Sequence, residues 1–224
     1  MVHPFLILEW LAEQVNLHLG PHVLYAWLVM ILLIVVAFFA TRKITETPSG
    51  LQNFMEAFIE LLENFIEENM GPKGKRYFPL IATLALFILS CNLIALVPSA
   101  FPPTANPNTN AAMALTVFVA THFIGFREHG FGYLKHFTGP MIALAPLMFV
   151  VEFIGHIARP VSLTLRLFGN MYGHEIVLMI FLIILPIVGP VPMMFMGIIV
   201  AFIQTFVFTL LSVIYIAGAL EEAH

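Results

Sequence analysis

The sequence contains no aspartate and a single cysteine, Cys91, so every acidic side chain is glutamate and no internal disulfide is possible. Only 10% of the 224 residues are charged, whereas soluble domains have roughly a quarter. Hydrophobic residues make up 60%, more than a soluble fold of this size can bury. This composition excludes a water-soluble enzyme, a nucleic-acid-binding protein and a disordered chain. A membrane-spanning helix takes roughly 20 apolar residues, so about five crossings fill this length.

Long apolar runs separated by segments rich in proline, glycine and charge predict where the chain crosses the membrane. We predict an all-α integral membrane protein, a single membrane domain over residues 1–224. The fourth run would measure about 67 Å as one straight helix, more than twice the roughly 30 Å hydrocarbon core. We therefore expect the last two crossings to form a long, tilted helical hairpin. The predicted crossings are residues 23–40, 78–98, 111–126, 141–185 and 193–220.

Residues 51–69 differ from the crossings, because apolar and acidic side chains recur there on opposite faces of a helix. Phe58 and Leu62 belong to the apolar face, and Glu60 and Glu67 to the acidic one. The pattern predicts an amphipathic helix along the membrane surface. Such helices usually carry basic residues, which suit anionic lipid. The acidic face is therefore either a solvated polar face or a docking face for a protein partner.

The basic residues predict the orientation of the chain. Of nine Lys and Arg, five lie between residues 42 and 76 and two between residues 127 and 140. Cytoplasmic loops carry an excess of these residues, so we expect both segments to be cytoplasmic. Five crossings then place the N-terminus outside and the C-terminus in the cytoplasm.

Two arginines, Arg159 and Arg166, remain inside the fourth apolar run. A charge at the bilayer centre costs about 2.5–3.5 kcal/mol on insertion scales, so two of them indicate a function. On a helix, seven polar side chains share an arc of roughly 120°, and Glu175 lies on the opposite side. The polar arc consists of Glu152, His156, Arg159, Ser162, Arg166, Asn170 and His174.

The polar arc allows two interpretations. Glu152, His156 and Arg159 could form a hydrogen-bonded network that holds helices together, with Glu152 pairing Arg159. Arg166 has no acidic residue one helical turn away, so it requires a carboxylate from another element, or water. That requirement indicates an ion path or a partner protein that carries the counter-charge.

The run Arg159-Pro-Val-Ser-Leu-Thr-Leu-Arg-Leu-Phe-Gly-Asn-Met-Tyr-Gly-His-Glu175 resembles the signature of subunit a of the F-type ATP synthases. The last crossing, with Gln204 and the ending that starts at Tyr215, is similar to the C-terminus of that family. Resemblance extends over nearly the whole chain, with residues 159–175 as its most specific part. Further matches are Gly71-Pro72, Tyr77-Phe78-Pro79, Asn92-Leu93, Pro98 and Pro103-Thr104-Ala105.

The resemblance implies a membrane stator subunit that binds no nucleotide and couples proton flow to rotation and ATP synthesis. Arg166 would face an essential carboxylate on each subunit of a ring of c subunits. Two aqueous half-channels, one from each side of the membrane, would end on opposite sides of this arginine. The implied partners are the c-ring proteolipid, subunit b of the peripheral stalk, the other ATP synthase subunits and the lipid bilayer. The implied location is the bacterial plasma (inner) membrane, and no cofactor is implied.

The same resemblance assigns residues to the path. Glu175 matches a carboxyl of the half-channel open to the outside, and Glu152 an acidic position nearer the cytoplasmic exit. Asn170 and Gln204 match positions near the arginine, where they help to line the path. Ser162 matches a small polar position one turn from the arginine, where hydrogen bonds that pack the helices are the alternative.

Some relatives carry a histidine where this chain has Gly197, and a small residue where it has His174. We therefore expect His174 to supply the imidazole beside Glu175. Tyr215 joins the expected path, and His122, inside the third crossing, is expected to be a packed, hydrogen-bonded histidine. No spacing of His or Cys predicts a metal site.

An autonomous ion channel or secondary transporter is the alternative function. A transporter needs a coupling carboxylate beside Arg166, but the nearest one, Glu175, lies on the opposite face of the helix. An intramembrane protease with paired aspartates is excluded, because the chain has none. No glycine-rich phosphate loop is present either, so nucleotide chemistry must reside on another polypeptide.

Overall fold

The computed structural model describes residues 8, 10, 19–42, 50–97, 100–130, 133, 145–186 and 188–220. These ranges contain six α-helices and no strand. Five segments are long and apolar enough to cross a membrane, which confirms the predicted all-α membrane fold. The helices are α2 (Pro21–Thr41), α3 (Leu51–Met70), α4 (Phe78–Leu93), α5 (Pro107–His129), α6 (Ala145–Ile184) and α7 (Pro190–Leu220), with short 3-10 turns η1 (Pro72–Tyr77), η2 (Ile94–Leu96) and η3 (Pro103–Ala105).

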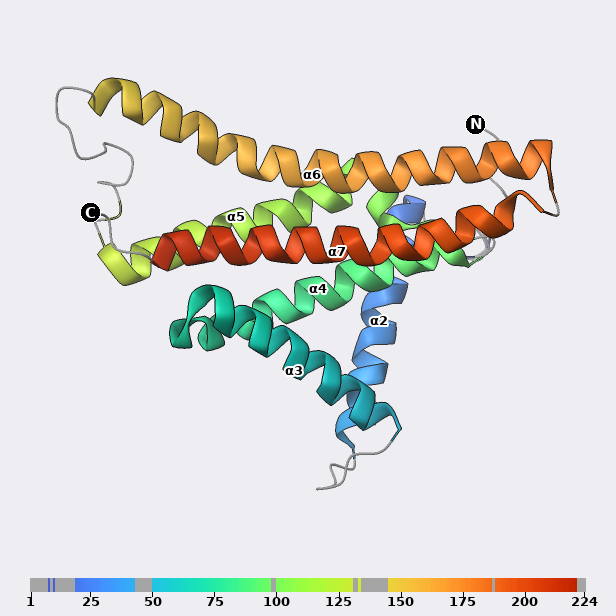
Figure 1. Cartoon of the computed structure of the whole chain (residues 1–224), viewed down its shortest axis with the longest axis horizontal. Coiled ribbons are helices and arrows are strands. Elements are labelled where there is room, and N and C mark those ends of the chain that lie inside the picture. Colours follow the sequence, from blue (N-terminus) through green and yellow to red (C-terminus); the bar gives the residue numbers. More distant parts are fainter. Residues whose placement is uncertain are drawn as a thin grey trace.

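Helices α6 and α7 form the long hairpin expected at the end of the chain, and they run antiparallel across Figure 1. They contain 40 and 31 residues, about 60 and 46 Å at 1.5 Å per residue. Both exceed the roughly 30 Å hydrocarbon core, so both must tilt in a bilayer. Figure 1 also shows that α6 bends partway along its length. Pro160 lies inside this helix, where a proline removes one backbone hydrogen bond.

Three helices begin two to four residues earlier than the apolar runs predict, α2 among them at Pro21, because proline is well suited to the first turn of a helix. Helix α5 begins at Pro107, inside the loop expected at residues 99–110. Asn106 caps it by accepting a hydrogen bond from the N–H of Asn108 at 2.9 Å. Helix α7 begins at Pro190, inside the expected turn. Apolar periodicity misses these starts because their first residues are polar or proline.

The core lies where α4, α5, α6 and α7 pack against one another. Ala114 of α5 and Ala201 of α7 are fully buried, and such small side chains let helices approach closely. Asn92 of α4 reaches α7, where its Nδ2 atom lies 3.4 Å from both the carbonyl oxygen of Ala201 and Oγ1 of Thr205. Hydrogen bonds of this kind help apolar helices associate in a membrane, where lipid removes the hydrophobic driving force.

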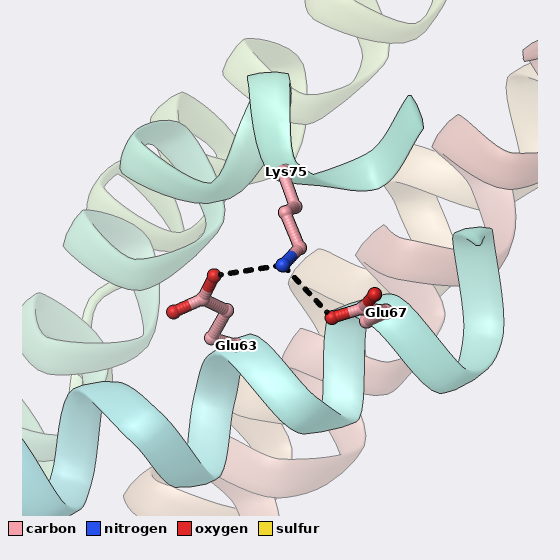
Figure 2. A network of polar contacts seen from close by, with 3 residues as sticks. All are labelled: Glu63, Glu67 and Lys75. Atoms are coloured by element: carbon pink, nitrogen blue, oxygen red, sulfur yellow. Dashed lines mark ion pairs between the residues drawn. The ribbon is translucent and has the colours of Figure 1, made fainter. Parts of the chain in front are cut away.

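Helix α3 is buried along one face and acidic along another. Ile66 is completely buried in a cluster with residues of α4, α5 and α7, whereas Phe54 is exposed. Figure 2 shows Glu63 and Glu67 on successive turns of α3, both pointing toward Lys75 of η1. The Nζ atom of Lys75 lies 3.4 Å from Oε1 of Glu63 and 3.1 Å from Oε2 of Glu67. The chain therefore neutralises this part of the acidic face itself.

Candidate functional site

Arg166 lies near the middle of α6, and no ion pair involves its guanidinium within the described residues. Its Nη2 atom lies 3.5 Å from Oγ of Ser162, one turn earlier on the same helix. An uncompensated charge inside a membrane is costly, and a side chain that carries one must find a partner or water. Within the described residues no carboxylate pairs with Arg166, so its partner is either water or a group outside this part of the chain.

The surface of α6 beside Arg166 consists of small side chains. A Cβ atom added at Gly155, Gly169 or Gly173 would meet no atom within 4 Å, so the face is open. Small residues allow another helix to approach closely. This row of small residues was not predicted from the sequence, although their separations of three, four and seven positions place them on one side of a helix. We call it the small-residue face; it lies within about 80° of Arg166 and consists of Gly155, Ala158, Ser162, Gly169 and Gly173.

On the N-terminal side of Arg166, the structure brings Glu152, His156 and Arg159 together. Oε1 of Glu152 lies 3.3 Å from Nε2 of His156 and 3.7 Å from Nη2 of Arg159. The guanidinium of Arg159 also lies over the ring of Tyr215 in α7, 5.2 Å from its centroid, as in a cation–π contact. These contacts match the network interpretation and extend it to a second helix.

We call Glu152, His156, Arg159 and Tyr215, which these contacts join, the Glu152 cluster. Two cavities lie beside it. One of about 80 Å³ is lined by Thr121, Tyr133, Glu152, His156, Arg159, Tyr215, Gly218 and Ala219. A smaller one, of about 10 Å³, shares four of these residues and also touches Leu163, one turn before Arg166. A water molecule needs a cavity of roughly 10–15 Å³ and several polar partners. The larger cavity therefore has room and polar groups for several waters.

His122 and Tyr133 join the Glu152 cluster from α5 and from the segment that follows it. The ring centroid of His122 lies 5.0 Å from that of His156 and 6.0 Å from that of Tyr133. Tyr133 is buried with its ring against Gly125, where no Cβ could be accommodated. Burial raises the pKa of the Tyr133 phenol above its ordinary value, so the phenol keeps its proton at neutral pH.

Neither the position of Tyr133 nor the contact of His122 with His156 was predicted from the sequence. His122 is hydrogen-bonded as expected, because its Nδ1 atom lies 2.9 Å from the carbonyl oxygen of Phe118. Its position as a histidine inside a crossing was the available signal for a further role. Tyr133 gave no signal, since it lies in a loop whose packing the sequence does not reveal.

On the C-terminal side of Arg166, His174 and Glu175 provide a second imidazole and a second carboxyl group. Nε2 of His174 lies 2.9 Å from the carbonyl oxygen of Met193 in α7. A carbonyl can only accept, so Nε2 carries the hydrogen, and Nδ1 is buried with no partner among the described residues. The imidazole fills the space above Gly197, where an added Cβ would lie 2.7 Å from Nε2. Glu175 is half-buried.

The remaining candidates are not joined to Arg166. Asn170 is exposed on α6 and Gln204 is half-buried on α7, and within the described ranges no hydrogen bond links either to the guanidinium. Along α6, His156 and His174 lie about 15 and 12 Å from Arg166 in opposite directions. The arginine thus stands between two imidazole–carboxyl groups. No set of three or more metal-ligating side chains occurs in the part of the chain that the structure describes.

Comparison with known proteins places the chain among close relatives. Residues 23–217 match the family described as ATP synthase A chain. The chain is 62% identical to ATP synthase subunit a 1 of Syntrophotalea carbinolica and 57% identical to ATP synthase subunit a of Trichlorobacter lovleyi. It is 56% identical to ATP synthase subunit a of Geobacter sulfurreducens, and each of these matches covers 100% of both chains. The chain therefore belongs to the ATP synthase subunit a family, the membrane subunit of that complex that is not itself catalytic.

Proposed function

We propose that the chain is the proton-translocating stator of its ATP synthase, and that a ring of c subunits docks on the small-residue face around Arg166. One observation carries this proposal: Arg166, which has no counter-charge among the described residues, lies beside an open helix face made of small side chains. A carboxylate on a ring helix would supply the missing charge, and the small side chains would let that helix come close.

Arg166 would keep each passing ring carboxylate ionised, because an opposite charge nearby favours the charged form. A proton therefore leaves the carboxylate as it approaches the arginine, and another binds after it has passed. Arginine does not lose its own proton in proteins, so Arg166 also blocks direct transfer between the two half-channels. A potential of 100 mV supplies about 2.3 kcal/mol for each proton that crosses.

The two imidazole–carboxyl groups support two half-channels on opposite sides of Arg166. Glu175 and His174 belong to the half-channel open to the outside. Glu152 belongs to the cytoplasmic half-channel, with Tyr215 on its wall and the 80 Å³ cavity beside it. Asn170, Gln204 and Ser162 line the approaches to the arginine and complete the path.

His174 takes the place of a histidine on the last crossing. Its ring occupies the space that a side chain at position 197 would fill, and this contact supports the exchange. The buried Nδ1 atom, without a partner among the described residues, is then the atom that accepts a proton from the outer half-channel.

In the orientation proposed from the basic residues, the N-terminus lies outside and the C-terminus in the cytoplasm of a bacterial inner membrane. Subunit b of the peripheral stalk would hold the chain against the torque of the ring. The exposed remainder of the acidic face of α3 is available to such a partner.

Replacement of Arg166 by alanine in the complete complex tests the proposal. ATP-driven proton pumping into inverted membrane vesicles should vanish, while ATP hydrolysis by the soluble sector persists. Arg127→Ala, which removes an exposed arginine at the end of α5, is the matched control and should pump normally. Normal pumping by the Arg166→Ala complex would sink the proposal. Proton conduction by the purified chain alone, in vesicles without c subunits, would favour the autonomous channel instead.

A further inference from the structure

The Glu152 cluster contains a pair of imidazoles to which the proposed path assigns no proton-transfer step. His122 of α5 and His156 of α6 pack edge to face, with ring centroids 5.0 Å apart and ring planes at 66°. At this separation the ring edges are within direct contact or one water molecule of each other. Two titratable rings from different helices thus meet beside Glu152.

Hydrogen bonds indicate which ring atoms can take up a proton. Nδ1 of His122 lies 2.9 Å from the carbonyl oxygen of Phe118 and must donate, which leaves Nε2 to accept. Nε2 of His156 lies 3.3 Å from Oε1 of Glu152, so next to an ionised carboxylate it carries the hydrogen. Nδ1 of His156 is then the atom that can accept.

The surroundings of the pair are polar and have room for water. Both cavities are lined by His156, and the smaller one also by His122. Among the described residues, the charged and titratable groups that face the pair are Glu152 and Arg159 of α6, Tyr215 of α7, and Tyr133 after α5. Arg159 is held between Glu152 and Tyr215.

We propose that His122 and His156 relay protons between the cavity water and Glu152. This inference rests on the proposed function and adds two residues to its cytoplasmic half-channel. Nε2 of His122 accepts a proton from a hydronium ion in the cavity water, which leaves a neutral water molecule. The proton on Nε2 is then transferred, directly or through one water molecule, to Nδ1 of His156. His156 then releases the proton of Nε2 to the Glu152 carboxylate and is left neutral with its hydrogen on Nδ1. A flip of the ring restores the starting arrangement before the next proton. Only N–H and O–H bonds form and break, and the His122 bond to Phe118 is kept throughout.

Glutamine substitutions separate a relay from a structural role, because an amide preserves polar packing but cannot carry a proton. His156→Gln, His122→Gln and the double variant are made in the complete complex, with His129→Gln of α5 as the matched control. After the soluble sector is removed from the vesicles, passive proton flux is measured under a potassium diffusion potential across a range of pH values.

Each single variant should lower the proton flux by about a hundredfold, the lower end of what a positioned proton-transfer group contributes. The double variant should lose no more than either single variant, because the two groups act in series. The control should match the wild type, and the pH dependence of the flux should change only in the cluster variants.

Wild-type flux and pH profile in His156→Gln would overturn the relay. So would fully additive losses, which indicate two independent structural effects. If His156→Gln prevents co-purification of the ring, His122→Gln decides by itself on the same criteria. Failure of the relay is distinct from failure of the proposed function, since Arg166→Ala is tested by ATP-driven pumping in parallel.

Discussion

Gly197 has no side chain, and the space that this leaves is where the imidazole of His174 lies. His174 fills this space and donates to the carbonyl oxygen of Met193. His174→Gly should lower ATP-driven proton pumping by at least about tenfold, because a positioned proton-transfer group is lost. His174→Gly combined with Gly197→His should restore most of it by returning an imidazole to the same space. His22→Gln at the start of α2 is the control; wild-type pumping by the single glycine variant would contradict the role of His174.

In the proposed function, docking of the ring on helix α6 depends on the small-residue face of that helix as well as on Arg166. Gly169→Leu should leave the subunit folded, because nothing lies within 4 Å of the added Cβ. It should nevertheless hold a ring helix away from Arg166, so recovery of the c-ring with the complex and ATP-driven pumping should both fall severalfold. Ala37→Leu on the exposed side of α2 adds the same bulk elsewhere and should have neither effect. Normal ring recovery and pumping in Gly169→Leu would show that this face is not the docking surface.

For the whole molecule, the proposed orientation follows from the distribution of basic residues and can be tested with few changes. The one native cysteine, Cys91, is completely buried and should not react with a membrane-impermeant maleimide. Lys73→Cys should react in inverted vesicles, where the cytoplasmic side faces the reagent, and Asn108→Cys only in right-side-out vesicles; both positions are exposed. The wild-type chain is the control, and the opposite labelling pattern would reverse the topology.

Much of the fold was predictable because lipid imposes simple rules on a chain. A crossing must be long, apolar and helical, so composition and run length suffice to place five of them. The starts of α5 and α7 were missed because prolines and a capping asparagine set them, not apolar periodicity. For Arg166, the absence of an acidic neighbour on its own helix was visible from spacing alone.

The sequence by itself determined the number of crossings, the long final hairpin and the polar side of α6, because helical periodicity and lipid operate along the chain. Only the tertiary structure decided which side chains from different helices meet. His122 against His156, Arg159 over Tyr215 and His174 above Gly197 each join residues separated by at least twenty positions. Periodicity assigns a residue to a face, but the neighbour on that face depends on how helices pack, and here small side chains and interhelical hydrogen bonds set that packing.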